Sequence, residues 1–194
     1  MKTAITRRQS ESMALVGLFA ALMAVMGLIP KIDLPLGVPI TIQSLGVMLA
    51  GCLLGPKRGV QAMLIFLLAV AAGLPLLAGG RGGLGVFLAP SAGYLLGYVV
   101  AAGLTGLLMG WLPHSTPLRT AGSALLASVL GGVVALHAMG IAGLVLVAKM
   151  GWMQALALDL VFVPGDLIKC VLCALVVHTV AKALPDWRFG GRSA

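Results

Sequence analysis

Two full charges stand in an apolar stretch near the end of the chain. Residues 162–170 read FVPGDLIKC, where Asp166 and Lys169 are flanked by Leu, Ile, Val and Phe. Charges at membrane depth are costly and usually face a partner, a cavity or a pathway. Their i, i+3 spacing also permits a simple ion pair at a helix start, where the helix dipole favours Asp166. The two groups can bind a ligand, because the ammonium neutralises an anion and the carboxylate accepts hydrogen bonds from N–H groups.

Other hydrogen-bonding groups occur where a membrane fold can bring them near this pair. They come from the segments VPITIQSLG and GLPLLAGGRGGLGVFLAPSAGY, and are Gln43, Gly80, Arg81, Gly82, Ser91 and Tyr94. Glycine lets backbone groups approach a ligand closely. Structural alternatives stay open: a helix-packing amide for Gln43, a flexible glycine loop, and an interfacial position for Tyr94 or Tyr98. Together these groups favour a site for a small amphiphilic ligand with an anionic end.

The composition indicates which scaffold must position these groups. Of 194 residues, 60% are hydrophobic and 9% are charged, whereas a soluble domain has about 25% charged residues. Several apolar runs exceed about 17 residues, enough to cross a bilayer. We therefore predict an all-α, polytopic integral membrane protein surrounded by membrane lipids. The net charge of +8 is interpreted as basic cytoplasmic loops, and no nucleic-acid partner is expected.

Prolines, glycines and charges divide the chain into six predicted transmembrane helices. These cover residues 13–29, 42–54, 60–74, 91–111, 120–147 and 164–184. Gly55 and Pro56 break the chain between the second and third spans. The fifth is longer than one crossing needs, so a bend or end is expected at Gly131-Gly132 or at Gly140.

The segment 152–163 is too short for a span and carries Asp159. It is predicted to be an interfacial or re-entrant piece. Pro164 is expected to open the sixth span, because a proline in the first helical position gives up no helical hydrogen bond.

Basic residues predict the orientation. Six spans put both ends of the chain on one side, and the positive-inside rule makes that side cytoplasmic (N-in, C-in). Three basic residues then lie in outside loops, Lys31, Arg81 and Lys149. Nine lie inside: Lys2, Arg7, Arg8, Lys57, Arg58, Arg119, Lys182, Arg188 and Arg192. We expect a cytoplasmic segment 1–12, a membrane domain 13–184 and a cytoplasmic tail 185–194, with the polar groups above in the outer half of the membrane.

An intramembrane enzyme is the competing class of function. Its candidate residues would be His114, His137 and His178, but no HExxH or paired-aspartate motif is present. None of the three is expected to cluster with Asp166. The three cysteines lie in apolar runs and are interpreted as packing residues rather than a redox motif. The sequence therefore predicts no catalytic residue, no metal site and no cofactor.

Four blocks of the sequence resemble the BioY family of biotin transporters: VPITIQSLGVMLAG, LLGPKRG, GLPLLAGGRGGLGVFLAPSAGYLLGY and FVPGDLIK. The resemblance covers most of residues 13–184 and is weaker over 112–150. Family members are substrate-binding S components of energy-coupling factor (ECF) transporters. The resemblance implies their six-helix fold, high-affinity capture of biotin from outside, and delivery through the inner membrane of a bacterial cell. Biotin would be the substrate, not a cofactor.

The resemblance also implies roles for the polar residues. Carried onto this chain, the family's binding residues fall on the glycine loop with Arg81, on Tyr94, and on Asp166 and Lys169. Biotin has two ureido N–H donors, a ureido carbonyl and a valerate carboxylate. Asp166 is assigned to the ureido N–H groups, and Lys169 or Arg81 to the carboxylate or the carbonyl. Which cation takes which end stays open.

Protein partners follow from the same resemblance. The first span carries a pattern of small residues that permits close helix contact, at Gly17, Ala20, Ala21 and Ala24. It resembles the surface with which S components dock onto the ECF transmembrane coupling subunit, and packing within the bundle is the alternative. No Walker A motif is present, so ATP hydrolysis would come from ABC ATPase subunits. Two other interpretations are an S component for another small vitamin and a solitary biotin transporter.

Overall fold

The computed structural model describes residues 2–32 and 38–191. Over these residues the regular structure is helical, apart from two isolated antiparallel bridges, Ile32–Ile40 and Leu77–Arg81. In the described chain, five helices are long and apolar enough to cross a membrane. The prediction of an all-α, multi-pass membrane protein is confirmed, while the count of six spans and the N-in orientation stay predictions.

Helix α1 (Lys2–Gly27) begins well before the predicted span, and residues 2–12 continue it rather than forming a separate segment. Its apolar part is Ser10–Gly27, of which 28% is buried. It packs chiefly against helix α2 (Gln43–Ala71). Most of the surface of α1 is therefore left for lipid or for another protein.

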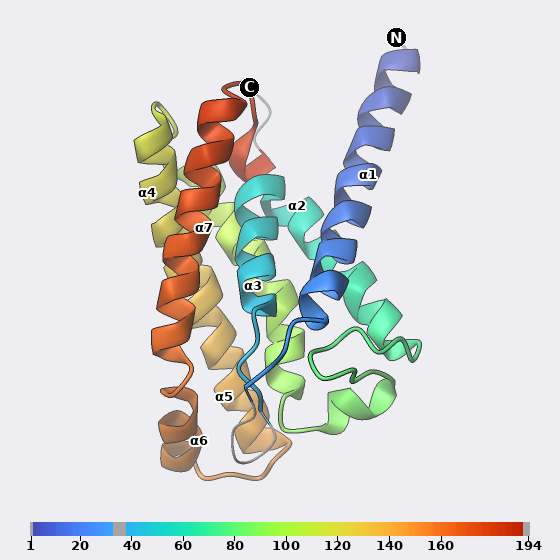
Figure 1. The fold of residues 1–194 in the computed structure, drawn as a ribbon, viewed down its shortest axis with the longest axis vertical. Coiled ribbons are helices and arrows are strands. Elements are labelled where there is room, and N and C mark those ends of the chain that lie inside the picture. Colours follow the sequence, from blue (N-terminus) through green and yellow to red (C-terminus); the bar gives the residue numbers. More distant parts are fainter. Residues whose placement is uncertain (1, 33–37, 192–194) are drawn as a thin grey trace.

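Helix α2 unites the predicted second and third spans across a sharp bend. Gly55 has φ 82° and ψ 178°, which no helix contains, and Pro56 follows it. The predicted break at these two residues is confirmed. Figure 1 shows the arm before the bend (cyan) and the arm after it (teal) running in opposite directions along the bundle. The carbonyl of Leu53, beside the bend, accepts a hydrogen bond from the Trp187 indole at 3.1 Å.

Helix α3 (Ala92–Trp111) is central: 56% of it is buried, and it packs against α2 and the fifth apolar region. A short 3-10 segment, η2 (Leu84–Leu88), precedes it. The fifth region is one rod, built from α4 (Pro117–Ser128), a π-helical segment η3 (Val129–Ala135) and α5 (Leu136–Leu146). The expected irregularity at Gly131-Gly132 is thus a π segment. The expectation of a bend or end at Gly140 is wrong, because α5 continues through it.

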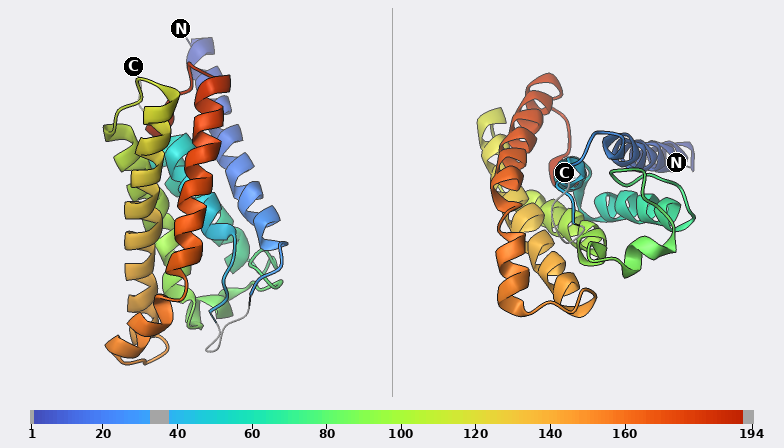
Figure 2. Two further views of the ribbon diagram at one scale, coloured as in Figure 1. Left: turned by 60° about the vertical axis from the view of Figure 1, so that its left-hand side comes forward. Right: turned by 60° about the horizontal axis from the view of Figure 1, so that its bottom comes forward.

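The last part of the chain is two helices and a returning segment. Helix α6 (Trp152–Asp159) is a separate short helix within the segment predicted to be interfacial or re-entrant, and that membrane placement stays a prediction. Helix α7 (Val163–Ala183) has Pro164 in its first turn, as predicted, and lies beside the α4–α5 rod (Figure 2). The segment η4 (Phe189–Gly191) packs back onto α2 and α3, so the predicted tail is not free over its described part. The start of α1 and the end of α7 lie at one end of the bundle (Figure 1).

Large flexible side chains fill the core between α1, α2 and α3, among them Met23, Met48, Met63, Phe66 and Met109. Close van der Waals packing of this kind stabilises helix association in a bilayer, where the lipid is as apolar as the side chains. The three cysteines are buried and free, as the packing interpretation requires.

Candidate ligand-binding site

The first turns of α2, α3 and α7 form a pocket with the segments that precede α2 and α3. Six of the eight predicted binding residues line it: Gln43, Arg81, Ser91, Tyr94, Asp166 and Lys169. Gly80 and Gly82 do not. The pocket lies toward the end of the bundle opposite the chain termini, because α2 and α7 both start there (Figure 1).

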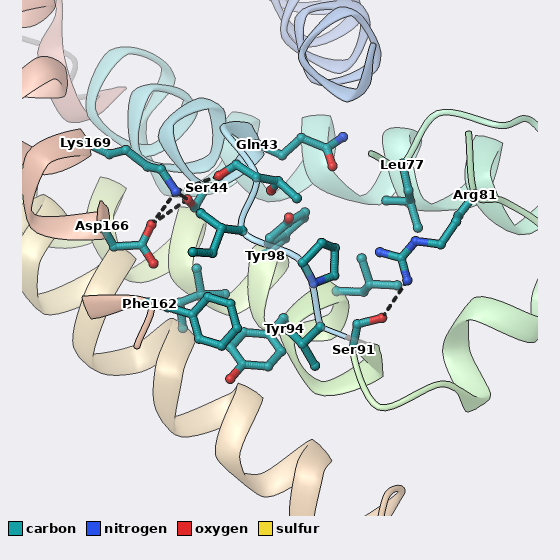
Figure 3. Close-up of a pocket in the computed structure, with 16 residues that line it drawn as sticks. Gln43, Ser44, Leu77, Arg81, Ser91, Tyr94, Tyr98, Phe162, Asp166 and Lys169 are labelled. Carbon is teal, nitrogen blue, oxygen red and sulfur yellow. Dashed lines mark hydrogen bonds and ion pairs between the residues drawn. The ribbon is translucent and has the colours of Figure 1, made fainter. Parts of the chain in front are cut away.

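Asp166 and Lys169 form an ion pair at the pocket wall (Figure 3), where Lys169 Nζ donates to Asp166 Oδ1 at 2.7 Å. The same ammonium donates to Ser44 Oγ at 2.9 Å and to the Thr41 carbonyl at 2.6 Å. Ser44 Oγ in turn donates to Asp166 Oδ1 at 2.8 Å. The two charges are therefore tolerated by mutual neutralisation and hydrogen bonding, and they also border the cavity. Both interpretations of Asp166 and Lys169 from the sequence, a structural ion pair and residues that line a pocket, therefore apply.

A second cation borders the other end of the pocket. Arg81 Nη1 donates to Ser91 Oγ at 3.3 Å, and its Nε donates to the Ala78 carbonyl at 3.4 Å. Figure 3 shows this corner across the pocket from the ion pair, with Tyr98, Tyr94 and Phe162 between them. The site thus has two polar ends and an aromatic middle. That shape suits an elongated ligand with polar ends and an apolar centre.

The glycines act through the loop that carries Arg81. Gly80 has φ 69° and forms the turn in which the Leu77 and Arg81 backbones bond to each other. A side chain on Gly82 would overlap the Leu74 carbonyl. Both positions need glycine because of loop geometry, and neither reaches the cavity.

Gln43 is 1% exposed and its amide is used by the protein itself. Nε2 donates to the Met23 and Leu76 carbonyls, each at 3.1 Å, and Oε1 accepts from the Ala78 N–H at 3.4 Å. Gln43 therefore joins the end of α1 and the α2–α3 loop to the start of α2. Gln43 is thus a helix-packing amide, which was one of the alternatives, and it also lines the pocket.

His137 and Asp159 were not among the predicted site residues, and the expectation that no histidine clusters with Asp166 is wrong. His137 Nε2 lies 2.9 Å from Asp166 Oδ2, and its Nδ1 lies 2.9 and 2.8 Å from the two Asp159 oxygens. Tyr94 donates its hydroxyl to Asp159 Oδ1 at 2.6 Å. A sequence signal existed, because His137 is the one ionisable residue between positions 120 and 147 and such residues mark functional sites.

The other two histidines lie elsewhere. His178 follows Asp166 by twelve residues on α7, about 18 Å along a helix, and His114 follows the far end of α3. No cluster of three or more His, Cys, Asp or Glu side chains in the described residues is arranged to hold a metal ion. Asp159 and Asp166 instead bond to different nitrogens of His137.

The small residues of α1 divide between two faces. Ala20 is buried and Ala24 partly buried against the core, whereas Gly17 and Ala21 are exposed. A side chain on Gly17 would meet nothing within 4 Å. Gly17 lines an apolar groove between α1 and the second arm of α2, with Met13, Leu64 and Ile65. The outer pair, Gly17 and Ala21, is the part of the motif open to contact from outside the bundle.

Comparison with known proteins gives relatives along nearly the whole chain. The biotin transporter BioY of Rhodobacter capsulatus is 46% identical over 186 residues, covering 91% of this chain and 96% of the relative. That of Rhizobium etli is 45% identical over 179 residues, with the same coverage. Both are named as transporters rather than enzymes.

One solved structure matches as well, a crystal structure at 2.1 Å of the S-component for biotin from an ECF-type ABC transporter. It is 30% identical, has a TM-score of 0.81, and the match covers 91% of this chain and 93% of that one. The model of the BioY family matches residues 1–186. The fold, the relatives and the family model agree, and the chain belongs to the BioY family.

Proposed function

We propose that this protein is the biotin-binding S component of an ECF-type ABC transporter and takes up biotin across the inner membrane of a bacterial cell. The observation that carries the proposal is the pocket with the Asp166–Lys169 pair at one end and Arg81 at the other, in a chain of the BioY family. The related proteins named biotin transporters support the choice of substrate. No cofactor enters this mechanism.

Biotin has one orientation that matches the two ends. Asp166 accepts hydrogen bonds from Lys169, Ser44 and His137, and a carboxylate offers about four acceptor positions. One position is thus left for a ureido N–H. Among the described residues, Arg81 donates to the neutral oxygens of Ala78 and Ser91, so it is the cation that a ligand carboxylate would neutralise. The thiophane ring and the valerate chain would lie along Tyr98 and Phe162.

The membrane placement in this proposal is six crossings, with N-in and C-in orientation and the pocket facing outward. The bend at Gly55 lets the two arms of α2 cross separately, and both ends of the chain lie at one end of the bundle (Figure 1). The excess of basic residues predicted for that end supports a cytoplasmic position.

The test is equilibrium binding of labelled biotin to the purified chain, with competition by unlabelled biotin, thiamine, riboflavin and pantothenate. Only biotin should displace the label at stoichiometric concentrations. A different vitamin that binds more tightly would establish the alternative S component. Failure of well-folded protein to bind any biotin would overturn the substrate assignment.

Arg81→Gln should weaken biotin binding about 10- to 100-fold, because a hydrogen bond to a charged group contributes about 1.5–3 kcal/mol. It should leave the binding of biotin methyl ester nearly unchanged, since the ester has no carboxylate. The matched control is Arg119→Gln, at an exposed arginine in the first turn of α4. Equal losses for biotin and its ester would remove Arg81 from the carboxylate end.

Gly17→Leu should abolish biotin uptake by cells that contain the ECF coupling and ATPase subunits, while purified protein binds biotin as before. The reason is that leucine would fill the outer contact surface of α1, where the first carbon of an added side chain meets nothing within 4 Å. Gly122→Leu is the matched control, since Gly122 is also a helical glycine with open space around it. Uptake that survives Gly17→Leu, or that persists in cells without those subunits, would favour a solitary transporter.

A further inference from the structure

A buried row of ionisable groups extends from the pocket into the protein. His137 of α5 is 5% exposed, Asp159 of α6 is 2% exposed and Asp166 of α7 is 5% exposed. Each imidazole nitrogen lies within 2.9 Å of a carboxylate oxygen, Nδ1 at Asp159 and Nε2 at Asp166. Only Asp166 of the three lines the pocket. His137 therefore reaches a ligand through Asp166, and Asp159 does so through His137 and through the pocket residue Tyr94.

The geometry sets how many protons this row holds. A neutral imidazole has one N–H donor and one acceptor nitrogen, and an ionised carboxylate only accepts. With both aspartates ionised and His137 neutral, one nitrogen lone pair would point at a carboxylate lone pair in a buried place. That arrangement loses a hydrogen bond and sets two acceptors against each other. An additional proton resolves the conflict, since both nitrogens of an imidazolium are donors.

The surrounding charges favour retention of this additional proton. The groups facing His137 are Asp159 on α6, Asp166 on α7 and the Tyr94 ring on α3, 6.3 Å away between centroids. Lys169 follows on the far side of Asp166. With imidazolium, the row alternates in sign from Asp159 to Lys169 and sums to zero. With neutral imidazole it carries one uncompensated negative charge, which is costly when buried.

We propose that His137 is a positioning residue that acts as an imidazolium: it bridges Asp159 and Asp166, fixes the Asp166 carboxylate for the ligand, and makes biotin affinity depend on a proton bound inside the protein. This inference deepens the proposed function and, in its binding readout, rests on it. Asp159 serves as the counterion that retains the proton, and the Tyr94 hydroxyl orients Asp159. Biotin itself neither gains nor loses a proton.

The sign of the pH dependence follows. Loss of the proton as pH rises leaves a neutral His137 between two ionised aspartates, so it can donate to only one of them and no longer bridges Asp159 and Asp166. Biotin affinity should therefore fall with rising pH. Because two carboxylates hold the imidazolium, the fall should lie above neutral pH, and measurements from about pH 5 to about pH 9 stay below the ordinary lysine pKa of about 10.4.

The variant Asp159→Asn removes the need for the additional proton while it keeps the shape of the side chain. The asparagine side chain introduced by this substitution has nearly the same shape, its oxygen can accept from the Tyr94 hydroxyl, and its NH2 can donate to a neutral His137 Nδ1. Nε2 then still donates to Asp166, and the row sums to zero without the extra proton. D159N should lose the alkaline fall, so that its biotin affinity is the same across this pH range. His137→Gln should weaken binding about tenfold at every pH, because Asp166 loses a charged hydrogen bond.

A second readout needs no biotin. In the full chain labelled with 15N-histidine, the signal absent from His137→Gln belongs to His137. Its two nitrogens should both be protonated in the wild type at neutral pH, and only Nε2 should be protonated in D159N. Asp186→Asn, at an exposed aspartate beyond α7, is the matched control and should change neither the spectrum nor the pH profile.

The outcomes are distinguishable. A neutral His137 in the wild type at neutral pH would overturn the inference, whatever the binding result. An alkaline fall that persists unchanged in D159N would overturn it too, because the proton would then reside elsewhere. Absence of biotin binding at all pH values, together with a doubly protonated His137, would reject the proposed function and leave the proton site standing. Thermal unfolding of each variant shows whether a loss of binding reflects loss of fold.

Discussion

Replacing Lys169 by methionine is expected to lower biotin affinity about 100-fold or more, equivalent to about 2.8 kcal/mol. The ammonium makes three hydrogen bonds, to Asp166, Ser44 and the Thr41 carbonyl. Methionine keeps the length of the side chain but removes one of the two cations beside the buried Asp166 carboxylate, and breaking a buried ion pair costs about 3–5 kcal/mol. The bond to the Thr41 carbonyl also holds the segment before α2 in place at the pocket. Removing the ammonium therefore removes this support of the pocket wall as well as the charge. Equilibrium binding of labelled biotin measures the effect.

The double variant Asp166→Asn with Lys169→Met tells a binding role from a structural one. It removes both charges, and the amide oxygen can still accept from Ser44 while the NH2 group, in the place of Oδ2, donates to Nε2 of a neutral His137. Thermal stability should recover toward wild type, whereas biotin affinity should stay low, because the charged acceptor for the ureido group is absent. Recovery of affinity in the double variant would make the pair purely structural. Lys182→Met, at an exposed lysine near the other end of α7, is the control.

Much of the scaffold could be predicted because a few residues limit what a helix can do. Pro164 lies in the first turn of α7 and Gly55-Pro56 bends α2 for reasons of backbone geometry that can be read from the residue types alone. The convergence of Asp166, Lys169, Arg81 and Tyr94 followed from placing their segments at one end of the bundle. Gly140 misled because it was interpreted as a helix breaker. It instead gives room to the Tyr94 ring, which a side chain there would overlap.

The hydrogen-bond partners could not be predicted, because they depend on which helix faces meet. His137 faces Asp166 after a π segment, Val129–Ala135, in which the i→i+5 pattern changes the register of the residues that follow. The local sequence does not predict that change in register. Gln43 was identified as polar and near the site, but its amide is used by carbonyls 20 and 33 residues away. Such pairings are set by tertiary packing.

Gly55→Ala is expected to destabilise the fold by about 2–5 kcal/mol. The conformation at φ 82° and ψ 178° is nearly restricted to glycine and costs other residues about 1–3 kcal/mol. An added methyl group would also overlap the backbone of Gly190 and Gly191, which return against the bend, and overpacking costs about 1–3 kcal/mol. Unfolding with increasing SDS in detergent micelles measures the change.

Gly73→Ala is the matched control, because Gly73 has φ 104° but nothing within 4 Å of an added side chain. It should show the backbone cost alone, about 1–3 kcal/mol, and the difference between the variants is the contribution of packing. Shortening the chain to end at residue 186 removes Gly190, together with the Trp187 bond to Leu53. In that background Gly55→Ala should cost no more than Gly73→Ala. If it still costs more, the bend is restrained by α3, whose Gly106 lies against the backbone of Gly55 and Pro56, rather than by the returning carboxyl-terminal segment.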